Sequence, residues 1–472
     1  MKFLKLSLVA SVAIIGFTNI GFAQPLEEAI KGIDISGMLR YRYTDDRFKD
    51  QGFIKDNGDK GSVNHAYRID MLFKTPIVNA ISFNLGIGYD NRSQNVSHGN
   101  GLYDDNGLID GTQGLGSGLG SGSDGKFGVR EFNALITPEA TATSIKVGKM
   151  VMDTPLNDTL DDRATGVLLT NSDLPHWTFA LGAYDSFSLD DVYQGWLGSD
   201  GSYTKPFYHL GAISNYETNY GNFGGQIWAF NLKDTMKFGT FAEISWDNSL
   251  LNLKAQYAYT KLDNSKESFL SQIHEGNLLT KDNDLYVLEA GMDFSKFDIP
   301  LGVTVGYWGN TKEGYVVSLD NEGAFSKVGQ IWFENAATGI GIGISNYGIH
   351  RNPTLNDKNR LSVIYGNLNY DILENLNIGI DYAGGKNKLT RSGVSGDIDF
   401  YEISPNITYW HTKSLQVFTY YSFLTTKADK NVVFASDFIG VDNSGLPIAF
   451  DNSKHTLKEK YNEFRVEVKY FF

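Results

Sequence analysis

Side chains of alternating character recur along almost the whole chain beyond Gly32, and this period of two constrains the fold more than any other feature. From Leu251 to Thr260, for example, Leu, Ala and Tyr residues alternate with mostly polar ones, and the segments 301–308 and 376–382 show the same pattern. One apolar face and one polar or glycine face are typical of a β-strand that is wet on one side only. We therefore expect an all-β protein whose polar inner faces surround a water-filled lumen.

The C-terminal segment shows the clearest alternation. From Phe464 to Phe472 the even positions are apolar, and the odd positions are Arg, Glu and Lys, with Phe471 the one exception. Soluble sandwiches contain such strands too. However, a terminal aromatic residue that closes an apolar face resembles the signal that the outer-membrane barrel assembly machinery recognises. We expect this strand, Lys460–Phe472, to pair with the first one, Ile33–Thr44, which closes a barrel and leaves no sheet edge.

The N-terminus has the pattern of an export signal. Lys2 and Lys5 precede an apolar run, Leu6–Phe17. This run is shorter than the ~20 residues of a helical membrane span. We expect residues 1–23 to be a cleaved signal peptide and residues 24–472 to form the barrel domain. A retained N-terminal anchor is the alternative.

Composition narrows the function classes. The chain has 55 acidic and 41 basic residues, which disfavours nucleic-acid binding because that needs a basic face. It has no Cys, which excludes disulfide scaffolds, thiolate metal sites and Cys nucleophiles. After the leader no stretch approaches 18 consecutive apolar residues, so helical spans are excluded, and a closed transmembrane β-barrel in the outer membrane remains.

Short and long connections between the expected strands alternate along the chain, as expected for a barrel with short periplasmic turns and long outer loops. Short connections are expected at 138–143, 247–249, 371–375 and 411–414, and long ones at 45–63, 93–126, 262–282, 311–358 and 425–458. Between the first and last strands we expect strands near 64–76, 80–92, 127–138, 143–150, 164–171, 176–186, 206–217, 223–232, 238–246, 250–261, 284–295, 300–310, 359–370, 376–386, 399–409 and 414–425. The total is about 18, an even number, as bacterial single-chain barrels require. If Val328–Phe333 and Ile340–Ile349 are also wall strands the count becomes 20, and a misread early pair would make it 16.

The stretch Gly107–Gly125 is of low complexity and is expected to be a flexible Gly/Ser-rich piece of an outer loop. Residues 120–125 fit the pattern G-x-G-x-x-G, but a strand rather than a helix is expected to follow, so we interpret the match as chance. The chain has no H-E-x-x-H, no G-x-S-x-G and no metal spacing among its eight His residues. We therefore expect no enzyme, and an outer-membrane lipase ranks last among the alternatives.

Basic residues alternate with aromatic ones in the first expected strand. Arg40 and Arg42 alternate with Leu39, Tyr41 and Tyr43, so both Arg residues face the lumen if the aromatic residues face lipid. A basic side chain on the lipid face near mid-membrane would cost ~2–4 kcal/mol. By the same reasoning the lumen also receives Arg68 and Lys74, whereas the direction of Arg130 stays open; the alternative is that these side chains merely solvate a wide pore.

Opposite charge comes from the segment Val151–Ala164, which carries Asp153, Asp158, Asp161, Asp162 and Arg163. If this loop folds inward, carboxylates that face basic side chains across a narrow passage create a transverse field that biases ion passage. An ordinary exposed acidic loop is the alternative. Crowded carboxylates repel one another, and a hard divalent cation held by oxygen ligands would relieve this repulsion.

Several blocks of the sequence resemble a known family. Residues 24–43 (QPLEEAIKGIDISGMLRYRY) look like the mature N-terminus of the major outer membrane porins of Campylobacter and related bacteria. The resemblance continues through residues 127–150, 185–187 and 369–385 and through the C-terminal strand. It covers most of the chain and is weaker in the long loops.

This resemblance implies an 18-stranded, homotrimeric general porin that passes small hydrophilic solutes with a preference for cations. It also implies a calcium ion near the constriction. By position, the candidate ligands are Asp161, Asp190 or Asp191, and Asp320 or Glu322. The chain departs from the family pattern in its shorter acidic loop with the extra Asp-Asp-Arg, in the spacing around residue 190, and in the insertion at 107–125.

The leading hypothesis is thus an outer-membrane diffusion porin in contact with lipids and lipopolysaccharide. A surface adhesin or receptor, whose long loops bind a partner while the lumen is closed, is the second hypothesis. A substrate-specific channel, in which basic and acidic groups recognise a zwitterion such as an amino acid, is the third.

Overall fold

The computed structural model describes most of the chain between residues 32 and 472. The described residues are 32–50, 55, 60–98, 126–160, 162–188, 202–203, 205–263, 265, 282–312, 314, 317–319, 323–335, 358–391, 393–431, 453 and 456–472. No helix within these ranges is long and apolar enough to cross a membrane.

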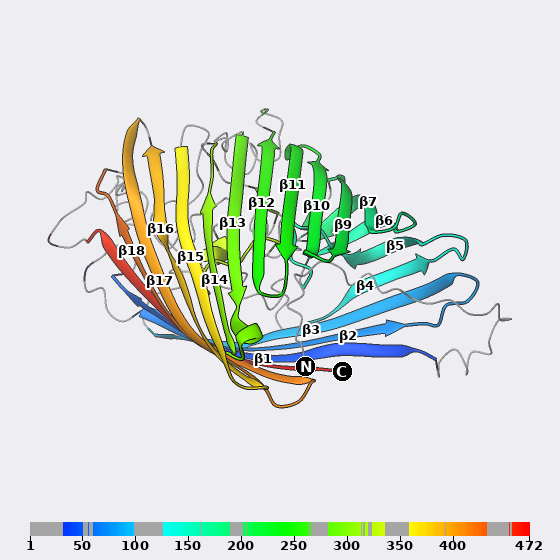
Figure 1. Ribbon diagram of the computed structural model, residues 1–472, viewed down its shortest axis with the longest axis horizontal. Coiled ribbons are helices and arrows are strands. Elements are labelled where there is room, and N and C mark those ends of the chain that lie inside the picture. Colours follow the sequence, from blue (N-terminus) through cyan, green and yellow to red (C-terminus); the bar gives the residue numbers. More distant parts are fainter. Residues whose placement is uncertain are drawn as a thin grey trace.

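A single antiparallel sheet contains the strands of the described residues (Figure 1). They are β1 (Asp34–Lys49), β2 (Lys60–Lys74), β3 (Ile81–His98), β4 (Lys126–Ile136), β5 (Thr143–Val151), β6 (Arg163–Asn171), β7 (Trp177–Ser188), β8 (Ser202–Tyr203), β9 (Phe207–Thr218), β10 (Gly221–Leu232), β11 (Met236–Asp247), β12 (Leu251–Leu262), β13 (Asp282–Asp293), β14 (Leu301–Gly309), β15 (Lys358–Leu373), β16 (Leu376–Arg391), β17 (Val394–Trp410), β18 (Leu415–Ala428) and β19 (Lys458–Phe471). The two-residue strand β8 pairs only with Phe187 and Ser188 at the end of β7, and β7 otherwise pairs directly with β9. The wall therefore has 18 strands.

Strands β1 and β19 close the barrel. Their register runs from Met38 opposite Phe471 to Lys49 opposite Lys460. This pairing confirms the closure expected from the sequence. All 18 expected strands are present, with ends that shift by a few residues, so the counts of 16 and 20 are wrong. Val328–Phe333 does not join the wall, because its last residues begin a short 3-10 helix, Trp332–Asn335. Ile340–Ile349 and Gly107–Gly125 lie outside the described residues.

The two ends of the barrel differ in their connections. One end, which we call the turn end, has only short connections, among them 137–142, 248–250, 374–375 and 411–414. The other end, the loop end, has the long ones, among them 99–125, 263–281, 310–357 and 429–457. The short and long connections agree with the sequence expectation. The connections 233–235 and 392–393 are short although they lie at the loop end.

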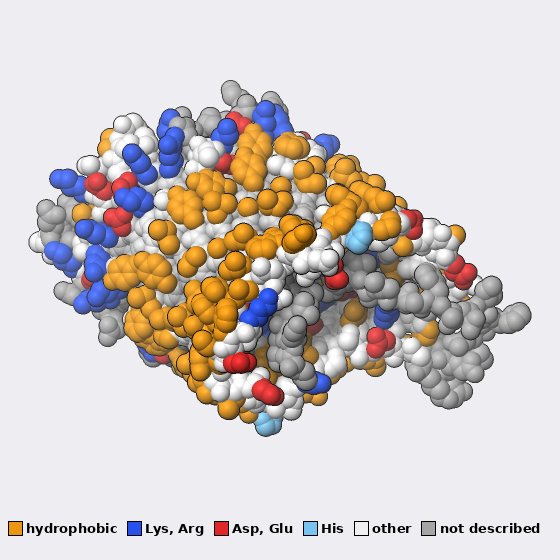
Figure 2. Space-filling model, in the orientation of Figure 1, with side chains coloured by type: hydrophobic (Ala, Val, Ile, Leu, Met, Phe, Trp, Pro, Cys, Tyr) orange, Lys and Arg blue, Asp and Glu red, His pale blue; other side chains and the backbone are white. Residues whose placement is uncertain are grey.

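Apolar side chains cover the outer face of the wall in a broad band (Figure 2). Ile227, Ile244 and Ile364 are 59%, 69% and 62% exposed, far more than an apolar side chain in a soluble core. Exposed apolar strand faces of this extent are suited to contact with lipid chains.

The inner face differs from the sequence expectation. Near the loop end of β9 to β14 it carries buried aromatic side chains, including Trp228, Phe230, Phe241 and Trp308, instead of polar ones. These side chains pack against described residues of two segments that lie inside the barrel, 152–160 with 162, and 317–319 with 323–335. The expectation of a uniformly polar inner face is therefore wrong, because chain segments fill part of the lumen and give the wall an apolar core to pack against.

Candidate functional site

Basic side chains of neighbouring strands meet on the inner face where the barrel closes. Arg40 on β1 lies opposite Arg68 on β2 and opposite Lys469 on β19, so three cations are adjacent in the sheet. Glu467, the cross-strand partner of Arg42, offsets this repulsion. Its carboxylate lies 2.6 Å from Arg42 Nη2, 2.5 Å from Lys469 Nζ and 3.8 Å from Arg40 Nη1.

A second carboxylate, Asp70 on β2, bridges two more arginines of this wall. Its oxygens accept hydrogen bonds from Arg68 Nε and, at 2.9 Å, from Arg130 Nη1. Arg130 lies at a β-bulge opposite Gly86 and Ile87, which explains why alternation did not give its direction. Its side chain extends over Gly88, where a Cβ atom would lie 2.2 Å from Arg130 Cδ. We refer to Arg40, Arg42, Arg68 and Arg130 as the arginine row.

The remaining predicted cation, Lys74, lies apart from this row. It is half-buried near the turn end of β2, opposite Asp34 and Asn84. The structure thus brings Arg40, Arg42, Arg68 and Arg130 together but not Lys74.

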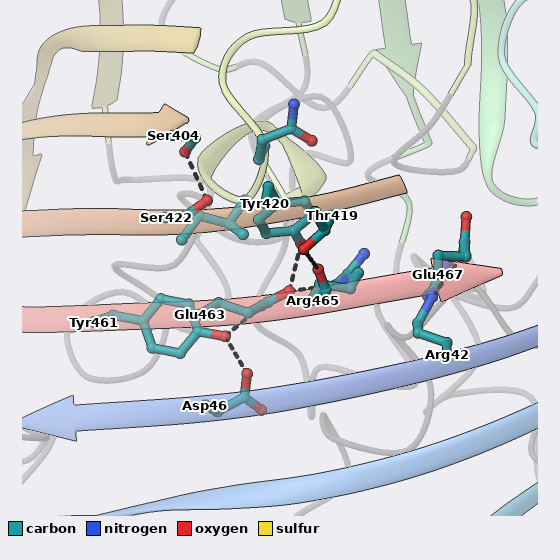
Figure 3. A network of polar contacts seen from close by, with 12 residues as sticks. Arg42, Asp46, Ser404, Thr419, Tyr420, Ser422, Tyr461, Glu463, Arg465 and Glu467 are labelled. Atoms are coloured by element: carbon teal, nitrogen blue, oxygen red, sulfur yellow. Dashed lines mark hydrogen bonds and ion pairs between the residues drawn. The ribbon is translucent and has the colours of Figure 1, made fainter. Parts of the chain in front are cut away.

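Aromatic and acidic side chains continue the polar wall toward the loop end (Figure 3). The Tyr461 hydroxyl lies 2.7 Å from an Asp46 oxygen and 2.6 Å from a Glu463 oxygen. Glu463 also accepts from Tyr420 and forms an ion pair of 2.7 Å with Arg465. This network joins β18, β19 and β1 and holds their polar side chains in fixed positions.

The acidic loop (residues 152–162) contacts the arginine row through its backbone. Arg68 Nη2 donates to the Leu160 carbonyl oxygen at 2.8 Å, and Arg163 Nη2 donates to the same oxygen at 3.1 Å. Asp162 is fully buried and accepts from the Asn157 amide at 2.8 Å. Asp158 accepts from the Leu160 N–H at 2.7 Å. The carboxylates of Asp158 and Asp162 thus form hydrogen bonds within the loop. The loop contacts the arginine row through the Leu160 carbonyl group.

Of the three described carboxylates of the acidic loop, Asp153 is the one that reaches solvent. Although its side chain is exposed, protein atoms surround it on most sides. This desolvation raises the pKa of Asp153, against an opposing effect of Lys146. Asp161 lies outside the described residues.

A second chain segment, not expected from the sequence to lie in the lumen, packs against the acidic loop. We call residues 317–319 and 323–335 the inner segment. The Leu319 N–H donates to the Leu156 carbonyl at 3.0 Å, and the Ala324 N–H donates to the Pro155 carbonyl at 2.9 Å. The two segments therefore form one body inside the barrel.

Glu402 on β17 fastens the inner segment to the wall. Its fully buried carboxylate accepts from the N–H groups of Gln330 at 2.5 Å and Trp332 at 2.8 Å, and from that of Ile331. Gly329 has φ of +73°, and a Cβ atom there would lie 2.7 Å from a Glu402 oxygen, so both its conformation and its surroundings require glycine. Glu402 is inward-facing because it alternates with the exposed Tyr401 and Ile403, and nothing in the sequence identified its partner.

A polar pocket of about 220 Å³ lies beside the inner segment, toward the turn end. Its lining residues are Lys254, Glu289, Thr304, Ser326, Lys327, Tyr365, Gly366, Asn367 and Asp381. Lys254 Nζ lies 3.0 Å from Glu289 Oε1, and Asp381 accepts from Asn367 at 2.7 Å. The pocket thus presents both signs of charge.

The structure does not describe the residues expected to bind calcium. Asp161, Asp190, Asp191, Asp320 and Glu322 all lie outside the described residues. In the part of the chain that the structure describes, no group of three His, Asp or Glu side chains could hold a metal ion.

Comparison with known families decides the assignment. The family described as Campylobacter major outer membrane protein matches residues 1–438. The chain belongs to this family. It is accordingly an outer-membrane channel protein of the porin type and not an enzyme, as the sequence resemblance implied.

Solved structures with the same fold share little sequence identity with this chain. Acinetobacter baumannii OccAB1 is 15% identical with a TM-score of 0.58, over 93% of this chain and 96% of that one. A BenF-like porin from Pseudomonas fluorescens Pf-5 is 15% identical with a TM-score of 0.57, over 93% and 98%. Pseudomonas aeruginosa OpdK, solved with vanillate, is 12% identical with a TM-score of 0.52, over 93% and 98%. No curated protein matches the chain.

Proposed function

We propose that this family member forms a water-filled passage for the passive diffusion of small hydrophilic solutes and ions. The observation that carries this proposal is the contact between the arginine row and the acidic loop inside a closed barrel. Arg68 donates to Leu160 of the loop, while Leu156 of the same loop accepts from the inner segment. Two chain segments inside the barrel leave a narrower passage than the wall alone would.

We propose a preference for cations. Glu467 and Asp70 offset half of the four positive charges of the arginine row, and most of that row is buried. Among the described carboxylates of the acidic loop, Asp153 is the exposed one. The whole chain carries a formal net charge of -14, which favours cations at the mouths of the passage. The sequence suggested that four aspartates of the acidic loop face the basic wall. We centre the proposal on Asp153, because the carboxylates of Asp158 and Asp162 accept hydrogen bonds from within the loop.

Calcium near the constriction and a homotrimeric assembly remain proposals that rest on the family resemblance. An oxygen-ligated Ca²⁺ would relieve the repulsion among the loop carboxylates. Chelation with EGTA should then lower the thermal unfolding temperature of the purified protein, and addition of Ca²⁺ should restore it. Native mass spectrometry of the protein in detergent would test the trimer.

The polar pocket favours a second candidate, a channel with a binding site for zwitterionic solutes. Lys254 and Lys327 lie in the same pocket as Glu289 and Asp381, so an ammonium group and a carboxylate of one solute could both find partners. A similar barrel, OpdK, was solved with the small carboxylate vanillate, which supports solute binding within this fold.

Flux into liposomes separates the two candidates. Free diffusion predicts that uptake of an amino acid such as glycine rises linearly with its concentration. A binding site predicts saturation in the millimolar range, and loss of saturation when Lys327 is replaced by Ala. Linear uptake by both proteins would leave the general porin as the function.

A further inference from the structure

Basic side chains gather on the outer face of β15 to β19 and β1, near the loop end, although the chain as a whole is acidic. On β15, exposed Lys358 and Arg360 alternate with buried Asn359 and Leu361. They thus lie on the same face as the lipid-exposed Ile364. Figure 2 shows Lys and Arg side chains at the upper left, beyond the apolar band.

These cations face one another directly across strands. Arg360 lies opposite Lys388, and Lys427 lies opposite Lys458. Like charges in such positions destabilise a sheet. Within the described residues, no ion pair engages the charged groups of these four side chains, which we call the cationic belt. On their other side, Lys388 and Lys427 lie opposite Asp397 and Asp399 of β17. Those two carboxylates lie 2.9 Å and 3.8 Å from Lys386 Nζ and form ion pairs with it instead.

The belt lies next to exposed aromatic side chains of the same strands. Tyr382, Tyr401 and Phe423 are 44%, 45% and 48% exposed on the outer face of β16, β17 and β18. Exposed aromatic residues mark the membrane interface of transmembrane barrels. Cations just beyond them, at the end with the long outer loops, lie at the level of the headgroups of the outer leaflet.

We infer that the cationic belt binds the phosphate groups of a phosphorylated glycolipid of the outer leaflet. A phosphate oxygen between Arg360 and Lys388, or between Lys427 and Lys458, converts each repulsive pair into two charge-assisted hydrogen bonds. The sequence suggested lipopolysaccharide only as a general neighbour, and the structure assigns it a place on the barrel. This inference rests on the outer-membrane location and not on the transport function.

The test is native mass spectrometry of the purified full chain in detergent, titrated with lipid A that carries its phosphates or with dephosphorylated lipid A. The variant R360Q/K388Q removes one repulsive pair. The control K296Q/K413Q removes two exposed lysines from the turn end. The variant R360K/K388R keeps both charges. Heat-dependent gel mobility shows that each barrel is folded.

We expect phosphorylated lipid A to bind the native chain more tightly than its dephosphorylated form. R360Q/K388Q should weaken that binding by roughly tenfold or more, whereas the control and R360K/K388R stay within about twofold. Millimolar inorganic phosphate should not displace the lipid. Equal binding of both lipids, an equal loss in the control, or displacement by inorganic phosphate would overturn the inference, and in those cases an acidic protein or a free anion becomes the better occupant.

Discussion

The guanidinium group of Arg68, on β2, donates a hydrogen bond of 2.8 Å to the carbonyl oxygen of Leu160, in the acidic loop 92 residues later in the chain. The same arginine pairs with Asp70, and its side chain is fully buried. One buried wall residue therefore joins β2 to the acidic loop and to Asp70.

Replacing Arg68 by Ala should release the acidic loop on this side. The lost bonds from a charged donor are each worth roughly 1.5–3 kcal/mol. We expect a larger and noisier single-channel conductance in planar bilayers. Arg47→Ala, which removes a more exposed arginine paired with Asp45 at the loop end, is the matched control and should conduct like the native chain. An unchanged conductance and noise in R68A would show that this bond does not restrain the loop.

Glu402→Ala should loosen the inner segment. It leaves three backbone N–H groups without their acceptor, at a cost of about 1–3 kcal/mol for each one that stays unsatisfied. We expect faster tryptic cleavage after Lys327, with an intermediate rate in Glu402→Gln, which keeps one oxygen acceptor. Glu374→Ala, in an exposed connection at the turn end, should leave the rate unchanged. Equal rates in all four proteins would contradict the anchoring role of Glu402.

Asp153→Asn should lower the preference for cations, seen as a shift of the reversal potential in a salt gradient. Desolvation raises the pKa of Asp153 above the ordinary value of about 4, so its charge is lost at a higher pH than that of an exposed aspartate. As the pH falls through this raised pKa, the native chain should lose cation preference. Because the neutral form is the favoured one in the folded state, this group contributes stability below its unfolded pKa, and that contribution is lost as pH rises through the raised value.

The asparagine variant should show no such change over this pH window. Asp298→Asn, at an exposed αL position of the turn end, is the control and should titrate like the native chain. A D153N variant whose reversal potential follows pH as the native chain does would place the selective charge elsewhere.

Gly88→Ala should disturb the arginine row without unfolding the barrel. The new methyl group would lie 2.2 Å from Arg130 Cδ, and that flexible side chain must move away from Asp70. We expect the reversal potential to shift as it does in Arg130→Ala. Gly291→Ala, which meets its neighbours only at 3.6 Å, is the control. A shift in the control but not in G88A would refute the role of this glycine.

The wall of the barrel could be predicted from the sequence, and its contents could not. Each strand can be recognised from its own residues, because a lipid-facing residue such as Ile227 alternates with an inward-facing one. The inner segment has no such local pattern, since its position depends on Glu402 and Gln256, which are 70 residues or so away in the chain. The sequence analysis expected a polar, wet inner face, whereas the inward-facing Trp228 and Phe230 pack inside a core that these distant contacts create.

The candidate site was predictable to the same extent. Arg40, Arg42 and Arg68 follow from alternation. Arg130 does not, because a β-bulge shifts its register. The part played by Asp158 and Asp162 depends on the fold of the loop itself, which composition does not reveal.

Single-channel recording in planar bilayers tests the central claim most directly. A passage narrowed by the acidic loop and the inner segment predicts stepwise conductance increments and a reversal potential on the cation-selective side, with larger steps in R68A. A protein that folds and inserts, as judged by heat-dependent gel mobility and protease protection, but never gives a conductance step would contradict it.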